Sequence, residues 1–141
     1  MNLAIAMGAL EQYRQVDACA SAVAEPHWLV QMLIDGALKR IAMARGCIAR
    51  RELAQKCDHL GRAMAIIEAL RLSLDRQQGA AIAQHLEDLY DYVGRRLLLA
   101  NARNDVSVLD EVASLLGEIR DAWIAIAPRR PQSPAPRPPG H

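Results

Sequence analysis

Apolar residues recur at alternating steps of three and four through four successive stretches of this chain. Such steps place apolar side chains along one face of a helix, so they predict helices over about 26–49, 52–75 and 80–102, and a fourth that ends near 126. Long helices joined by links of a few residues fold back on one another. The predicted fold is therefore all-α, an antiparallel up-down four-helix bundle.

The apolar faces of these helices form the predicted core, which we call the seam. The seam positions are Val30, Ile34, Ala37, Ile41, Ala44 and Ile48; Leu60, Ala63, Ile67, Leu70 and Leu74; Ile82, Leu86, Leu89, Val93, Leu97 and Ala100; and Val108, Val112, Leu115, Ile119, Trp123 and Ile126. Pro26 is favourable at an early helical position, and Gly79 marks a break between the second and third predicted helices. Asp105 or Ser107 is the predicted cap of the fourth helix.

Composition supports helices and excludes some partners. Hydrophobic residues make up 52% of the chain and alanine is abundant, which favours packed helices over a sheet. Without the three arginines that follow residue 127, the body carries 14 basic and 16 acidic residues. We therefore expect no nucleic acid partner, because phosphate binding needs a clustered basic surface. No apolar run approaches the ~20 residues of a membrane span, so we expect a cytoplasmic protein without membrane insertion.

The two ends of the chain differ from the bundle. Residues 1–25 are predicted to form a short N-terminal helical segment and a link, since Leu3, Met7, Leu10 and Tyr13 recur at helical spacing. The bundle is predicted over 26–127. Residues 128–141 contain six prolines in fourteen positions, which predicts a disordered, extended tail.

Residues suited to catalysis or metal binding show no useful spacing. The cysteines, Cys19, Cys47 and Cys57, are odd in number and lack a CxxC spacing, so free thiols in a reducing cytosol are expected. No glutamate lies three residues before a histidine, the spacing that di-iron bundles use. We expect no catalytic site, no metal site and no cofactor.

Three of the predicted helices carry more apolar residues than a seam needs. Single exposed apolar residues are ordinary scatter, but a second apolar stripe repeated on several helices usually marks a partner site. The predicted partner contacts are Trp28, Leu29, Met32, Met43, Ile66, Leu72, Tyr92, Leu98 and Leu99. For Tyr92 both readings stay open, since it falls at the edge of the seam and could serve packing or partner contact.

A set of short motifs follows in order along the chain. Residues 79–97 read GAAIAQHLEDLYDYVGRRL, and 26–30, 32–38 and 64–70 read PHWLV, MLIDGAL and MAIIEAL. Asn104-Asp105, Asp110-Glu111-Val112 and Asp121-Ala122-Trp123 follow. Together these motifs, at these separations, resemble the FliS family of flagellin-specific flagellar secretion chaperones, from about Tyr13 to Trp123.

The resemblance implies a function and two partners. Members of this family are cytoplasmic helical bundles that bind the disordered C-terminal segment of flagellin in apolar grooves and prevent premature polymerisation. They also dock on the cytoplasmic domain of the flagellar export gate protein FlhA, and Tyr13, with Leu10 beside it, matches the tyrosine implicated in that docking. The partner contacts above would then form the flagellin-binding surface.

Three positions depart from the family pattern. Glu25 stands before Pro26 where serine is usual, Trp28 where an acidic residue is common, and Ile34 where an aromatic residue is common. These departures affect the expected groove contacts. The alternative hypothesis is a helical-bundle adaptor or chaperone of another secretion or regulatory system.

Overall fold

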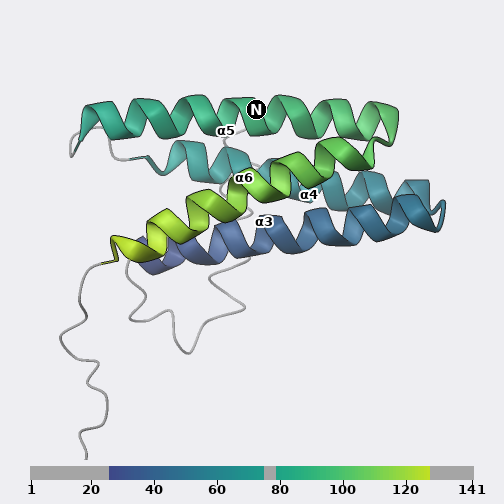
Figure 1. Cartoon of the computed structure of the whole chain (residues 1–141), viewed down its shortest axis with the longest axis horizontal. Coiled ribbons are helices and arrows are strands. Elements are labelled where there is room, and N and C mark those ends of the chain that lie inside the picture. Colours follow the sequence, from purple (N-terminus) through teal and green to yellow (C-terminus); the bar gives the residue numbers. More distant parts are fainter. Residues whose placement is uncertain (1–25, 75–78, 128–141) are drawn as a thin grey trace, which may run out of the picture.

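The computed structural model describes residues 26–74 and 79–127, which form four helices. They are α3 (Pro26–Ala49), α4 (Leu53–Leu72), α5 (Ala80–Arg103) and α6 (Val106–Ala125). Successive helices run in opposite directions, and α6 lies obliquely between the end of α5 and the start of α3 (Figure 1). The predicted all-α, antiparallel up-down bundle is confirmed. The expectations for residues 1–25 and 128–141 concern segments outside the described residues.

Each helix contacts the helices before and after it, and α6 closes the ring against α3. Polar contacts reinforce this closing α3–α6 pair. His27 Nε2 donates to the Trp123 carbonyl oxygen and Trp123 Nε1 donates to the His27 carbonyl oxygen, each at 2.8 Å. Their rings stack with centroids 4.2 Å apart. We call this arrangement the His27–Trp123 clasp.

Local backbone chemistry explains the helix ends. Gly79 precedes α5 with φ of 108°, a left-handed conformation that glycine adopts without strain. Asn104 ends α5 with φ of 53°, and asparagine tolerates this region better than most residues. The carboxylate of Asp105 then accepts the backbone N–H of Ser107, so the cap of α6 is Asp105 rather than Ser107.

The core follows most of the predicted seam. Its largest fully buried side chains are Leu33, Ile34, Ile41, Leu60, Leu70, Val93, Leu97, Leu109, Val112 and Leu116. Leu33, Leu109 and Leu116 were not among the seam positions. Each helix of a closed ring faces two neighbours, so its buried stripe is wider than a single row of residues spaced three and four apart.

Three apolar residues were placed wrongly. Ile66 was predicted to lie on the surface, but it is 3% exposed and belongs to the core, because α4 packs against both α3 and α5. Ile82 and Ile126 were predicted in the seam, but they are 66% and 64% exposed. Ile82 lies in the first turn of α5, and Ile126 directly follows α6. Both are exposed because residues at the ends of a bundle have fewer neighbours to cover them.

Candidate functional site

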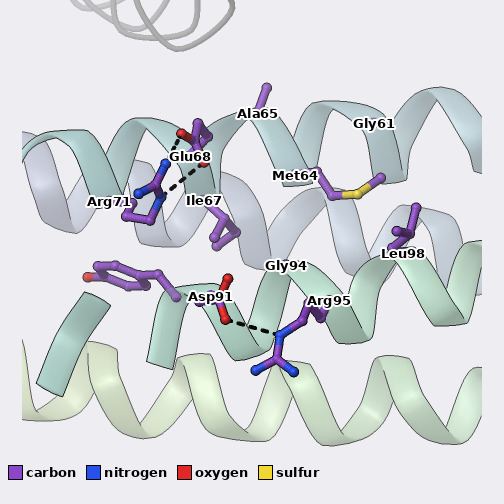
Figure 2. Close-up of a pocket in the computed structure, with 11 residues that line it drawn as sticks. Gly61, Met64, Ala65, Ile67, Glu68, Arg71, Asp91, Gly94, Arg95 and Leu98 are labelled. Carbon is purple, nitrogen blue, oxygen red and sulfur yellow. Dashed lines mark hydrogen bonds and ion pairs between the residues drawn. The ribbon is translucent and has the colours of Figure 1, made fainter. Parts of the chain in front are cut away.

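An open groove runs between α4 and α5 on the outside of the bundle, with a volume of about 380 Å³. Its apolar and small lining residues are Gly61, Met64, Ala65 and Ile67 from α4 and Tyr90, Gly94 and Leu98 from α5. Figure 2 shows Met64 on the side of α4 that faces α5, and Leu98 rising from α5 at the same end. The groove is therefore a mainly apolar hollow with one strongly exposed leucine, since Leu98 is 60% exposed.

Two polar contacts, one on each side of the middle of the groove, hold α4 and α5 together. Arg71 Nη1 donates to Glu87 Oε2 at 3.4 Å, and Lys56 Nζ donates to the Asn101 carbonyl oxygen at 2.8 Å. In antiparallel helices, a step forward along one helix is a step backward along the other. These contacts therefore place Gly94 level with Met64, and Gly61 close to the level of Leu98.

Lys56 is a buried charged residue that sequence reasoning did not single out. It is 3% exposed, and its Nζ also donates to Asn101 Oδ1 at 2.7 Å. Backbone carbonyls in the last turn of a helix lack intrahelical donors, so the ammonium group satisfies one of them. No pattern of apolar spacing could reveal this contact, because it depends on the side-by-side register of two helices.

Paired charges line the polar rim of the groove. Arg71 binds Glu68 and Glu87, and hydrogen bonding to Glu68 raises the pKa of the Arg71 guanidinium. Arg95 Nε donates to Asp91 Oδ2 at 3.0 Å, an i,i+4 pair on α5. Because these charges neutralise each other within the chain, the rim presents little net charge to an occupant.

The inner wall of the groove stays uncharged. Tyr90 is only 2% exposed, and burial raises the pKa of its hydroxyl to about 12. A phenol with that pKa is neutral at physiological pH. Ile67, 3% exposed, forms part of the same wall. The wall therefore suits an apolar partner surface.

The other predicted contacts on α5 lie away from the groove. The Tyr92 hydroxyl donates to Glu111 Oε2 at 2.5 Å, and Arg96 pairs with Glu111 at 2.9 Å, so this face of α5 contacts α6. The hydrogen bond to Glu111 raises the pKa of Tyr92. For Tyr92, the structure therefore supports packing within the bundle. Leu99 is half-buried and is not a lining residue of the groove.

The predicted contacts on α3 and α4 are divided. On α3, Trp28, Leu29 and Met32 are half-buried and Met43 is 40% exposed, and none of them lines the groove. Leu72 is 45% exposed and lies seven residues after Ala65, on the same face of α4. Ile66 is buried.

Leu10 and Tyr13, which were predicted to dock on the export gate, lie outside the described residues. Gly61, Met64 and Gly94 were missed as groove residues. The sequence signal that could have revealed Gly61 and Gly94 was the presence of a glycine in the interior of each of two predicted helices.

Within residues 26–74 and 79–127, no group of three or more His, Cys, Asp or Glu side chains is placed to hold a metal ion. None of the described helices is long and apolar enough to cross a membrane. Both described cysteines carry free thiols, Cys47 buried and Cys57 exposed.

Comparison with known proteins identifies the family. The family model described as flagellar protein FliS matches residues 8–130. The flagellar secretion chaperone FliSB of Pseudomonas aeruginosa is 43% identical over 123 residues, which cover 86% of this chain and 98% of that protein. The flagellar secretion chaperone FliS of Salmonella typhimurium is 39% identical over 122 residues, covering 85% and 90%. That of Vibrio cholerae is 35% identical over 122 residues, covering 86% and 90%.

These matches extend over the whole bundle, so a likeness to one motif does not account for them. A helical bundle with an open apolar groove belongs to the class of binding modules, and the matched relatives are secretion chaperones. The chain belongs to the FliS family of flagellar secretion chaperones. The proteins of this family are chaperones and not enzymes.

Proposed function

We propose that this chain is a cytoplasmic export chaperone that binds the disordered C-terminal segment of flagellin in the α4–α5 groove. Bound there, the segment is kept from premature polymerisation and held for the flagellar type III export gate. The observation that carries the proposal is the 60% exposure of Leu98 above an uncharged wall. Burying a leucine side chain contributes ~1.5–3 kcal/mol, so an apolar helix that covers Leu98 gains affinity there.

The polar contacts at Arg71–Glu87 and Lys56–Asn101 support this use of the groove. They fix α4 against α5 on both sides of the middle of the groove, so the groove exists before any partner binds. A pre-formed groove restricts the ordering cost mainly to the partner. A disordered segment that folds on binding loses ~2–5 kcal/mol of interaction energy to its own ordering, which the apolar burial has to exceed.

Calorimetry and circular dichroism test this mechanism. The probe is a synthetic peptide of the C-terminal segment of flagellin from the same organism, and the control is the same composition in scrambled order. We expect a negative heat-capacity change on binding, because apolar surface is buried, and a gain of helical signal beyond the sum of the parts. A heat-capacity change near zero, or binding of the scrambled peptide with equal affinity, would contradict coupled folding in the groove.

We further propose that residues 1–16 serve delivery to the export gate, with Leu10 and Tyr13 docking on the cytoplasmic domain of FlhA. This proposal rests on the family resemblance of Tyr13. Deleting residues 1–16 should leave the bundle helical and flagellin binding intact or tighter, while docking on FlhA and motility fall. A point variant, Tyr13→Ala, serves as the matched control for the loss of the whole segment. Loss of flagellin binding in a helical deletion variant would assign the segment to the cargo site instead.

A further inference from the structure

Two helix-interior glycines line the α4–α5 groove without a role in the fold. Glycine inside a helix is less favourable than alanine, because it has the lower helix propensity. Neither Gly61 nor Gly94 has the positive φ that would require glycine; Gly79 is the only glycine with such an angle in the described part of the chain. A Cβ added at either position meets no atom within 4 Å. Packing within the bundle therefore explains neither residue.

We propose that Gly61 and Gly94 determine which helix the groove accepts. A docked helix would present two small side chains, such as alanine, serine or glycine, where it meets these residues. The proposal rests on the proposed function above, in which the occupant is the C-terminal segment of flagellin. It adds a specificity rule, because a helix with an apolar face but without the two small residues would not fit the groove.

The register of α4 and α5 sets the spacing in this rule. Gly94 lies level with Met64, and Gly61 precedes Met64 by three residues. The two glycines are therefore separated by roughly 5 Å along the groove, close to one helical turn. An occupant aligned with the groove meets them with residues at i and i+3 or i+4, which lie on one face of a helix. Small or missing side chains on both partners let the backbones approach closely, because the distance between packed helices depends on the side chains at the contact.

The rim favours an occupant with an uncharged face. Its arginines, Arg71 and Arg95, are already paired with acidic residues of this chain. A charged occupant would have to displace these pairs or leave its own charge without a partner at the rim. Met64 and Leu98 lie beside the glycines and offer apolar contacts to larger residues of the occupant. The expected occupant face thus combines two small residues with flanking apolar residues.

Alanine substitutions test the rule because they add only one methyl group each. Gly61→Ala and Gly94→Ala should raise the melting temperature slightly through helix propensity. The same methyl group should lower the affinity for the flagellin C-terminal peptide by about tenfold. It would occupy space that the docked helix needs, and such overpacking weakens a close contact by about that factor. The double variant should bind more weakly than either single variant.

Gly117→Ala is the matched control. Gly117 lies inside α6, a Cβ added there also meets no atom within 4 Å, and it is not a lining residue of the groove. It should raise stability as the other two do and leave affinity unchanged. The second readout is a set of flagellin peptides in which each small residue is replaced by leucine. We expect two strong losses of affinity, three or four positions apart.

The outcomes separate this inference from the proposed function. If Leu98→Asp weakens peptide binding while Gly61→Ala and Gly94→Ala bind like Gly117→Ala, the specificity rule is wrong and the groove remains the cargo site. If all four variants bind like the unchanged protein, the groove does not hold flagellin, and both proposals are overturned. A selective loss in the two groove glycine variants supports the rule.

Discussion

The α3–α6 and α4–α5 pairs are both neighbouring helices of one bundle, but they differ in how their contacts are distributed, and an open groove lies along α4–α5. Along α3–α6, polar contacts occur at one end, in the middle and at the other end. They are the His27–Trp123 clasp, the ion pair between Arg120 and Asp35, and the pair between Arg45 and Asp110 at 2.8 Å. Along α4–α5, Arg71 and Lys56 make such contacts at both ends, while the middle contains two glycines.

The difference shows how a helical bundle can stay closed and still leave an open apolar groove. Contacts at both ends of α4–α5 keep the helices in register, and the absence of side chains at Gly61 and Gly94 keeps the middle open. If the groove binds flagellin as proposed, stability and binding depend on different residues of the same helix pair. Variants that affect only one of the two properties can therefore test this separation.

The strongest test compares two neighbours on α5. Leu97 is 0% exposed and Leu98 is 60% exposed. Leu97→Ala should lower the free energy of unfolding by ~2–5 kcal/mol, through lost burial and the cavity left behind. Leu98→Asp should leave the bundle folded and abolish most flagellin binding. Urea unfolding and peptide calorimetry on both variants measure the two effects, and unfolding of the Leu98→Asp protein would show that the groove is part of the core.

The sequence predicted the helices well because their limits depend on local chemistry. The three–four spacing, Gly79 and Asp105 placed every described helix end within about three residues of its observed position. The same spacing identified Leu98 as a surface residue. It could not place Ile66, because burial of that side chain depends on α4 having two helical neighbours. The groove was missed for a similar reason, since it depends on Gly61 and Gly94 lying close together across two helices.

The next test concerns the closed side of the bundle. Trp123→Ala removes the stacked ring and the hydrogen bond to the His27 carbonyl oxygen. We expect the free energy of unfolding to fall by about 2–3 kcal/mol, less than for a fully buried tryptophan because Trp123 is half-buried. Peptide affinity should change little, since the clasp belongs to the other helix pair. A loss of affinity as large as that of Leu98→Asp would mean that the two sides are coupled.

A smaller effect is expected at the end of the open pair. Lys56→Met keeps the apolar stem but leaves the Asn101 carbonyl oxygen without this donor. An unsatisfied buried acceptor costs ~1–3 kcal/mol, so the bundle should remain folded with a lower unfolding midpoint. Because the register of α4 and α5 loosens, peptide affinity should fall as well. Lys39→Met, at an exposed position of α3, is the charge-matched control and should change neither property.

The smallest expected effect is the acid sensitivity of the α3–α6 pair. Hydrogen bonding to Arg45 lowers the pKa of Asp110 below its ordinary range. A carboxylate whose pKa is lower in the folded protein contributes its stability above the unfolded pKa, and that contribution disappears as pH falls through the folded value. Arg45→Met should therefore reduce stability slightly at neutral pH, and the difference from the unchanged protein should vanish as pH falls through the lowered pKa of Asp110 in the folded protein.

Both side chains of that pair are 54% exposed, so solvent and salt screen the interaction and the change should be small. Urea midpoints measured at several pH values, at low and high salt, provide the comparison. Arg95→Met is the matched control, since Arg95 also forms an exposed ion pair but on the rim of the α4–α5 groove. Arg45→Met should leave peptide affinity unchanged. If it weakened flagellin binding, a polar contact of the α3–α6 pair would contribute to the site, and the proposal that the binding site is confined to the α4–α5 pair would be wrong.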